Sequence, residues 1–112
     1  MRTSRSKDTT WYKWEKEIAD HFGVEPTPGS GNQDWQKCDV VTDEYLIDCK
    51  NTDKNSYSLK KDLFDKYKPI AALEGKEFVV AVNLNGEKLA ILPLDTFLNL
   101  EEEAWKYRDL HN

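Results

Sequence analysis

Asp48 and Lys50 stand two residues apart in an apolar segment that begins at Tyr45. Because side chains two residues apart along a strand share a face, a strand here would set a carboxylate beside an ammonium group. Alone, such a pair is usually a surface ion pair that contributes about 0 to 1 kcal/mol to stability. Together with further carboxylates it could instead bind a cation and orient a water molecule.

A second carboxylate is expected opposite Asp48. Residues 38–41 and 45–50 have the β-branched content of two strands joined as a hairpin. If the turn is 43–44, the pairing register sets Asp39 opposite Asp48 on one face. Like charges about 5 Å apart across a ladder are destabilising. The two carboxylates must therefore be solvated, have one of them protonated, or share a cation.

The same register sets Cys38 opposite Cys49 on the other face of the hairpin. Two cysteines make no disulfide scaffold, and with His21 and His111 they give no zinc-ligand spacing. We interpret both cysteines as packing residues with free thiols, which is typical of a cytoplasmic protein. His21 is expected on the surface of its helix.

A third carboxylate, Glu15, belongs to a helix predicted over residues 9–22 and ended by a glycine. At about 100° per residue, Glu15 falls within the apolar stripe of this helix, whereas Glu17 points away. A carboxylate on an apolar stripe is costly unless it has a partner. Glu15 could complete a site with the other two carboxylates, although Lys16, Lys50 or a helix turn could also satisfy it.

A hard cation such as Mg²⁺ suits this set of groups. It takes a few carboxylate oxygens, keeps several waters and bridges a phosphate. Its charge lowers the pKa of a bound water toward hydroxide formation. Lys50 could orient the attacking water and stabilise negative charge on a pentacoordinate phosphorus. The residues therefore predict metal-dependent phosphoryl chemistry.

The ordered set of Glu15, Gly29-Ser30-Gly31, Asp39 and Asp48-Cys49-Lys50 resembles the PD-(D/E)xK nuclease superfamily. Within it, the set is most similar to the archaeal-type Holliday junction resolvases and their phage relatives. The resemblance covers about residues 11–97. It implies a restriction-endonuclease-like mixed β-sheet flanked by helices, and a homodimeric endonuclease that hydrolyses phosphodiester bonds in four-way junctions or other branched DNA.

The resemblance also implies a role for each matching residue. The catalytic residues would be Glu15, Asp39, Asp48 and Lys50. The ligands of Mg²⁺, for which Mn²⁺ could substitute, would be Glu15, Asp39, Asp48 and the backbone carbonyl of Cys49.

Charge is distributed unevenly along the chain. The net charge is -5, yet residues 1–16 and 50–68 each carry +3. The candidate DNA contacts are Ser30, Lys54, Tyr57, Lys60 and Lys61. Each has an ordinary alternative, because Ser30 could be a turn residue, the lysines a solvated helix face and Tyr57 a packing residue.

The remaining segments complete an α/β (α+β) fold class. The expected elements are a helix over 59–67 that continues past Pro69 to Gly75, strands over 78–82 and 89–92 with a turn at Asn85-Gly86, and a last helix at about 100–110. A strand, helix and strand in this order favour parallel pairing between 45–50 and 78–82.

Residues 1–8 are expected to form a flexible basic arm, and residues 9–112 a single nuclease-like domain. The apolar runs are far shorter than the ~20 residues of a membrane span, so a cytoplasmic location is expected, in the host if the protein is phage-encoded. Phe97, Trp105 and Tyr107 are candidates for a homodimer interface. Two alternatives stay open: a small phage-type nuclease acting on other branched or single-stranded DNA, and a non-catalytic nucleic-acid-binding module of the same fold.

Overall fold

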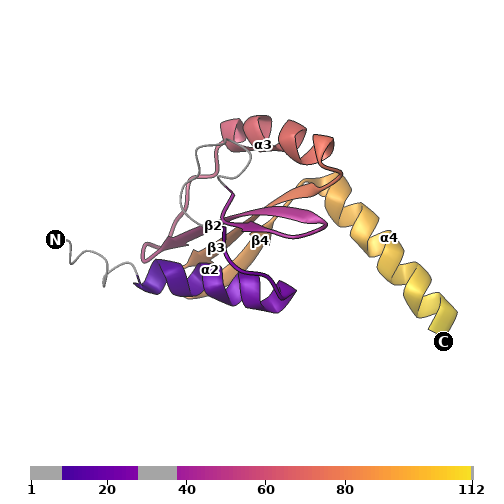
Figure 1. The fold of residues 1–112 in the computed structure, drawn as a ribbon, viewed down its shortest axis with the longest axis horizontal. Coiled ribbons are helices and arrows are strands. Elements are labelled where there is room, and N and C mark those ends of the chain that lie inside the picture. Colours follow the sequence, from indigo (N-terminus) through magenta and orange to yellow (C-terminus); the bar gives the residue numbers. More distant parts are fainter. Residues whose placement is uncertain (1–8, 28–37, 112) are drawn as a thin grey trace.

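The computed structural model describes residues 9–27 and 38–111, so the predicted arm 1–8 and the predicted loop at 29–31 lie outside the described residues. Within them the chain forms an α+β fold with three helices and a four-stranded mixed sheet (Figure 1). The elements are α2 (Thr9–Phe22), β1 (Val40–Val41), β2 (Tyr45–Thr52), α3 (Lys61–Leu73), β3 (Glu77–Leu84), β4 (Glu87–Ile91) and α4 (Leu94–His111).

The strands lie in the order β1-β2-β3-β4. β2 and β3 pair in parallel from Tyr45 with Glu77 to Thr52 with Leu84, which confirms the predicted connection through α3. β1 and β4 pair antiparallel at the two edges. The two central strands carry apolar residues on both faces, as expected for strands covered on both sides.

The helices α2 and α3 cover opposite faces of the sheet (Figure 1). On the α3 side the buried cluster consists of Cys38, Leu46, Tyr67, Ala71, Phe78, Val80 and Val82. On the α2 side it consists of Trp14, Ala19, Val40, Ile47, Cys49 and Ala81. The alternation of neighbouring residues between these clusters is that of regular strands. The prediction of a mixed sheet flanked by helices is confirmed.

The first predicted helix is confirmed, because α2 spans Thr9–Phe22 and stops before Gly23, whose φ of 72° is a left-handed conformation that favours glycine. Trp14 anchors the helix on the sheet. Its indole Nε1 donates a hydrogen bond to the carbonyl oxygen of Ala81 at 3.0 Å. A fixed contact to β3 sets the rotation of α2 and therefore the direction of every other side chain on it.

The hairpin register is also confirmed. Val40 pairs with Ile47 and Val41 with Leu46, which is the register that sets Asp39 level with Asp48. The prediction that the two cysteines share a face is wrong, because Cys38 lies in the cluster under α3 and Cys49 in the cluster under α2. β1 begins only at Val40, so strand alternation does not apply to the residues before it.

Two helix boundaries differ from expectation. α3 begins at Lys61 rather than residue 59, and it runs through Pro69 without a break. α4 begins at Leu94 rather than near residue 100. Pro93 has a fixed φ suited to a helix start, and its carbonyl oxygen accepts a hydrogen bond from the Phe97 amide at 3.1 Å. Among the described helices, none is long and apolar enough to cross a membrane.

Candidate active site

The open edge of β2 brings the predicted residues together. β1 pairs with β2 only as far as Ile47, so the Cys49 amide that follows has no strand partner on this side among the described residues. The Asp39 carboxylate takes that place, and its Oδ2 accepts a hydrogen bond from the Cys49 N–H at 2.8 Å. The carboxylate of Asp39 is thereby fixed beside the segment that carries Asp48.

Glu15 reaches the same place from α2. The residue is 5% exposed, and its Oε2 has no hydrogen-bond partner among the described residues. Burial raises the pKa of Glu15 to about 8, with further contributions from the charge of Asp39, a hydrogen bond with that carboxyl, and the charge of Asp48. Glu15 is therefore mostly protonated at neutral pH, and its predicted inward direction is confirmed.

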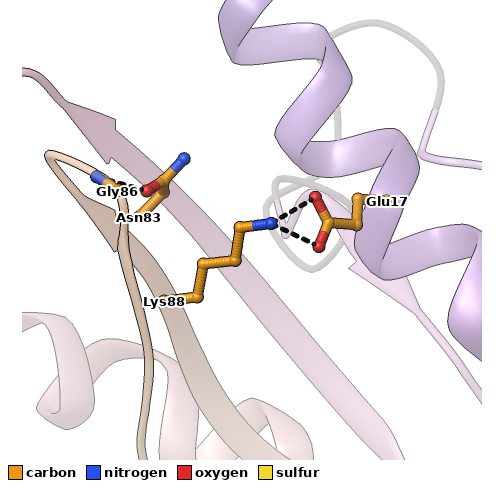
Figure 2. A network of polar contacts seen from close by, with 4 residues as sticks. All are labelled: Glu17, Asn83, Gly86 and Lys88. Atoms are coloured by element: carbon orange, nitrogen blue, oxygen red, sulfur yellow. Dashed lines mark hydrogen bonds and ion pairs between the residues drawn. The ribbon is translucent and has the colours of Figure 1, made fainter.

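Glu17, two residues further along α2, points away from this site. Figure 2 shows its carboxylate against Lys88 of β4, with Nζ 2.9 Å from Oε2 and 3.1 Å from Oε1. The strand end that carries Lys88 is held by a turn in which Asn83 Oδ1 accepts a hydrogen bond from the Gly86 amide (Figure 2). Both partners of the ion pair are exposed, so Glu17 is an ordinary surface carboxylate.

Asp39 joins three segments of the chain. Besides its side-chain bond to Cys49, its backbone carbonyl accepts a hydrogen bond from the Thr27 amide at 2.8 Å. Burial raises the pKa of Asp39 and the charge of Asp48 adds to this, while the Cys49 N–H opposes it. Asp39 thus has a structural role that sequence patterns did not reveal, because an amide left open by a short strand is visible only in the folded sheet.

Asp48 and Lys50 form the predicted pair on β2. Asp48 is 8% exposed, and Lys50 Nζ lies 3.2 Å from its Oδ2 as an ion pair. That oxygen accepts no aligned hydrogen bond from the described residues. Burial lowers the pKa of Lys50, but the neighbouring Asp48 carboxylate outweighs it, and the net direction is upward. The Lys50 side chain is 40% exposed, so a protonated ammonium group connects the buried carboxylates with solvent.

Tyr57 lies close enough to Asp48 and Lys50 for their charges to shift its pKa. Burial raises the pKa of its phenol, Lys50 lowers it, and Asp48 raises it. The residue is half-buried and also packs against the cluster under α3. The structure therefore brings one of the five predicted DNA contacts to the site.

The other predicted DNA contacts stand apart from the carboxylates. Lys54 and Lys60 are exposed on the segment between β2 and α3, and Lys61 is exposed as the first residue of α3. Lys61 Nζ makes an ion pair with Asp65 at 2.9 Å along its own helix. Ser30 lies outside the described residues.

The chemistry of the donors fits a hard cation. Glu15 Oε2 and Asp48 Oδ2 are buried oxygens without hydrogen-bond partners among the described residues, and carboxylates are the oxygen ligands that Mg²⁺ takes. Within residues 9–27 and 38–111, no group of three or more His, Cys, Asp or Glu side chains is gathered closely enough to hold a metal ion. Cation binding would thus require the carboxylates to rotate toward one another.

The cysteines are not reactive groups. Burial raises the pKa of the Cys38 thiol to about 12, and it raises the pKa of the Cys49 thiol as well. Both thiols are free and stay protonated near neutral pH, as expected of packing residues.

Comparisons with known proteins identify no relative. No protein-family model matches the chain, and neither a curated protein nor a solved structure matches it.

Proposed function

We propose that this protein is a Mg²⁺-dependent, structure-selective DNA endonuclease, similar to Holliday junction resolvases, with a restriction-endonuclease-like fold and acting as a homodimer. The observation that carries the proposal is Glu15. A carboxyl group buried on the apolar side of a helix interacts with two further carboxyls, Asp39 and Asp48, that come from separate segments.

A purely structural reason for this cluster is hard to find. Burial of one carboxylate beside two others destabilises the fold, and a well-packed apolar residue at position 15 would avoid that cost. Ionisable groups with strongly shifted pKa values, gathered from distant segments, are typical of functional sites. Lys50, which pairs with Asp48, has a raised pKa and adds the positive charge that phosphoryl transfer requires.

In the proposed reaction Glu15, Asp39, Asp48 and the Cys49 carbonyl would hold Mg²⁺, and Mn²⁺ could replace it. The bound cation would supply a water of lowered pKa and neutralise charge on the phosphate. Lys50 remains protonated and is held 3.2 Å from Asp48, so its ammonium group can donate a hydrogen bond to a water or phosphate oxygen. Until a cation is present, Glu15 carries the proton that limits repulsion within the cluster.

DNA would approach from the side where Lys50 reaches solvent. Tyr57 borders this side and could stack on an unpaired base. Lys54, Lys60 and Lys61 would contact phosphates along the exposed segment that follows β2.

The test is a cleavage panel of four-way junctions, flaps, single strands and duplexes, each incubated with Mg²⁺ and with a chelator. Wild-type protein should nick junctions symmetrically only with the metal, and Asp48→Asn should lose at least about 1,000-fold of that activity. Asp53→Asn, which alters an exposed carboxylate just after β2, is the matched control and should cut normally.

The other outcomes separate the alternatives. Metal-dependent cutting of flaps or single strands, with junctions left intact, would replace the resolvase by the small phage-type nuclease. Binding of DNA without cutting, in either Mg²⁺ or Mn²⁺, would indicate the non-catalytic module. Absence of both binding and cutting would refute the proposal.

A further inference from the structure

α4 is an 18-residue helix that extends away from the sheet (Figure 1). It docks on the body at its start, where the Thr96 hydroxyl donates a hydrogen bond to Glu77 Oε1 of β3 at 2.6 Å. Thr96 is the one buried residue among those of α4 whose side chains are described, and every residue from 97 to 110 is exposed. Most helix stability in proteins comes from packing of an apolar face against another surface. Beyond Thr96, α4 has no such surface packed on it among the described residues.

Four exposed apolar side chains form a stripe along the helix. At about 100° per residue, they fall on the face turned away from Thr96. These are Leu94, Phe97, Leu98 and Trp105, whereas the exposed Leu100, Tyr107 and Leu110 lie on the Thr96 side. Leu94 is 70% exposed, Trp105 60%, Leu98 53% and Phe97 49%. Near the body the stripe runs into an apolar groove of about 610 Å³ between α3 and α4, which Leu94 and Leu98 help to line.

The negative charge of α4 excludes nucleic acid as the partner that packs on this stripe. The helix carries five acidic residues and two basic ones, a net charge of -3 with the histidine neutral. A polyanion would be repelled along its whole length. The cover must be a protein surface that offers apolar contact.

We propose that the cover is α4 of a second copy of this chain, packed antiparallel about a twofold axis. Two charged residues lie within the apolar stripe, Glu101 and Arg108, and they have opposite signs. With the axis between Ala104 and Trp105, Glu101 of each copy faces Arg108 of the other, and the two Trp105 rings meet near the centre. One helix thus supplies both halves of a self-complementary surface.

The length of α4 suits an antiparallel pair. An 18-residue helix is about 27 Å long, and the free end of each α4 would lie toward the groove at the base of the other. Within one chain Arg108 Nη2 is 3.4 Å from Glu101 Oε2, and the guanidinium lies 5.3 Å from the Trp105 ring, so both charged groups already stand on the stripe. The pairing rests on the proposed function in one respect, the expectation of a homodimer, and nothing in it depends on the carboxylate cluster.

The experiment is a charge exchange read by light scattering on a sizing column. Wild-type protein should have about twice the monomer mass of 13.1 kDa at micromolar concentration. Glu101→Arg alone and Arg108→Glu alone should each weaken the dimer by at least about 10-fold, because each creates two like-charge contacts across the axis. An equimolar mixture of the two variants should recover a dimer that contains one copy of each.

This recovery distinguishes contacts between chains from contacts within one. Each variant keeps two like charges on its own helix, so only pairing between different chains restores opposite charges. Glu103→Arg, on the side of α4 opposite the stripe, is the matched control and should dimerise as wild type does. A monomeric wild type, or two single variants that both remain fully dimeric, would overturn the proposal.

Cleavage assays on the same samples keep the two proposals separate. A dimer that responds to the charge exchange but cuts no DNA would leave the α4 interface standing and refute the nuclease. A wild-type monomer that cuts DNA would refute the interface and leave a metal-dependent nuclease.

Discussion

The helices α2 and α4 use their apolar faces in opposite ways. α2 buries Trp14 and Ala19 against the sheet and carries Glu15, a carboxyl group, into the same buried layer. α4 leaves Trp105 and its apolar neighbours exposed and buries Thr96 instead. One helix therefore holds a carboxyl group where an apolar side chain would be more stable, and the other holds apolar side chains where water lies.

Both arrangements destabilise the isolated chain. A buried carboxyl group becomes less costly when a cation binds to it, and an exposed apolar stripe becomes less costly when a protein covers it. We therefore interpret the two exceptions as two binding surfaces, one for a metal ion and one for a second chain. Matched substitutions in the two helices test this interpretation.

The largest difference in the free energy of unfolding is expected between substitutions of Trp14 and Trp105. Trp14→Ala should lower the free energy of unfolding by about 3 to 5 kcal/mol, because it leaves a cavity between α2 and β3 and frees the Ala81 carbonyl. Trp105→Ala, made in the Glu101→Arg background at a concentration where that variant is monomeric, should change it by less than about 0.5 kcal/mol. Urea denaturation of both variants measures the difference. Similar losses would mean that α4 is packed on the body after all.

Much of this layout follows from the sequence. A helix stop at Gly23 and a 3.6-residue period gave both the length of α2 and the rotation that separates Glu15 from Glu17, because local rules determine both. The hairpin register followed from the length of one turn. The turn at Asn85-Gly86 was predicted correctly, and Asn85 has the positive φ of 46° that such turns require.

What the sequence did not reveal depends on contacts between distant segments. The early start of α4 is tied to the docking of Thr96 on Glu77, nineteen residues away. The separation of Cys38 from Cys49 and the bond from the Cys49 amide to Asp39 follow from a β1 of only two residues. A hydrophobic pattern does not say where a short edge strand ends, so these features could not be predicted from it. The nuclease assignment itself stays a prediction.

The next difference is expected between the two glutamates of α2. Glu15→Gln should lower metal-dependent DNA cleavage by about 100-fold or more, because a ligand of the cation becomes neutral. Glu17→Gln should leave cleavage within about 2-fold of wild type, since it removes only an exposed ion pair to Lys88. Single-turnover rates on one DNA substrate provide the measurement. Equal effects would show that Glu15 has no special role.

A smaller difference should separate the two aspartates of the site. Asp39→Asn and Asp48→Asn should both abolish cleavage, as should Lys50→Ala. In stability they should differ, because Asp39→Asn weakens a charge-assisted hydrogen bond to the Cys49 amide and should cost about 1 to 2 kcal/mol. Asp48→Asn relieves repulsion within the cluster and should be neutral or slightly stabilising without metal. Urea denaturation with a chelator present gives both values. If Asp48→Asn proves the more damaging, Asp48 rather than Asp39 holds the edge of β2.

A further predicted effect is a dependence of metal-free stability on pH. The pKa of Glu15 is about 8 in the folded protein against an ordinary 4.5, so between these values the folded state binds more protons than the unfolded state. Stability contributed by Glu15 is then complete below about pH 4.5 and is lost as the pH rises through 8. The melting temperature of wild type in a chelator should fall over this window, relative to Glu15→Gln, by at least about 5 °C.

Adding Mg²⁺ provides a control for the pH dependence. Mg²⁺ binds ionised carboxylates, so it competes with the proton on Glu15 and should raise the melting temperature more at about pH 8 than at about pH 5. Glu17→Gln keeps the cluster intact and should follow wild type at both pH values, because its carboxylate lies outside the cluster at Lys88. A wild type and a Glu15→Gln variant with parallel pH profiles, unaffected by Mg²⁺, would mean that the carboxyl group buried by α2 holds no functional proton. The contrast between α2 and α4 would then reduce to a difference in packing alone.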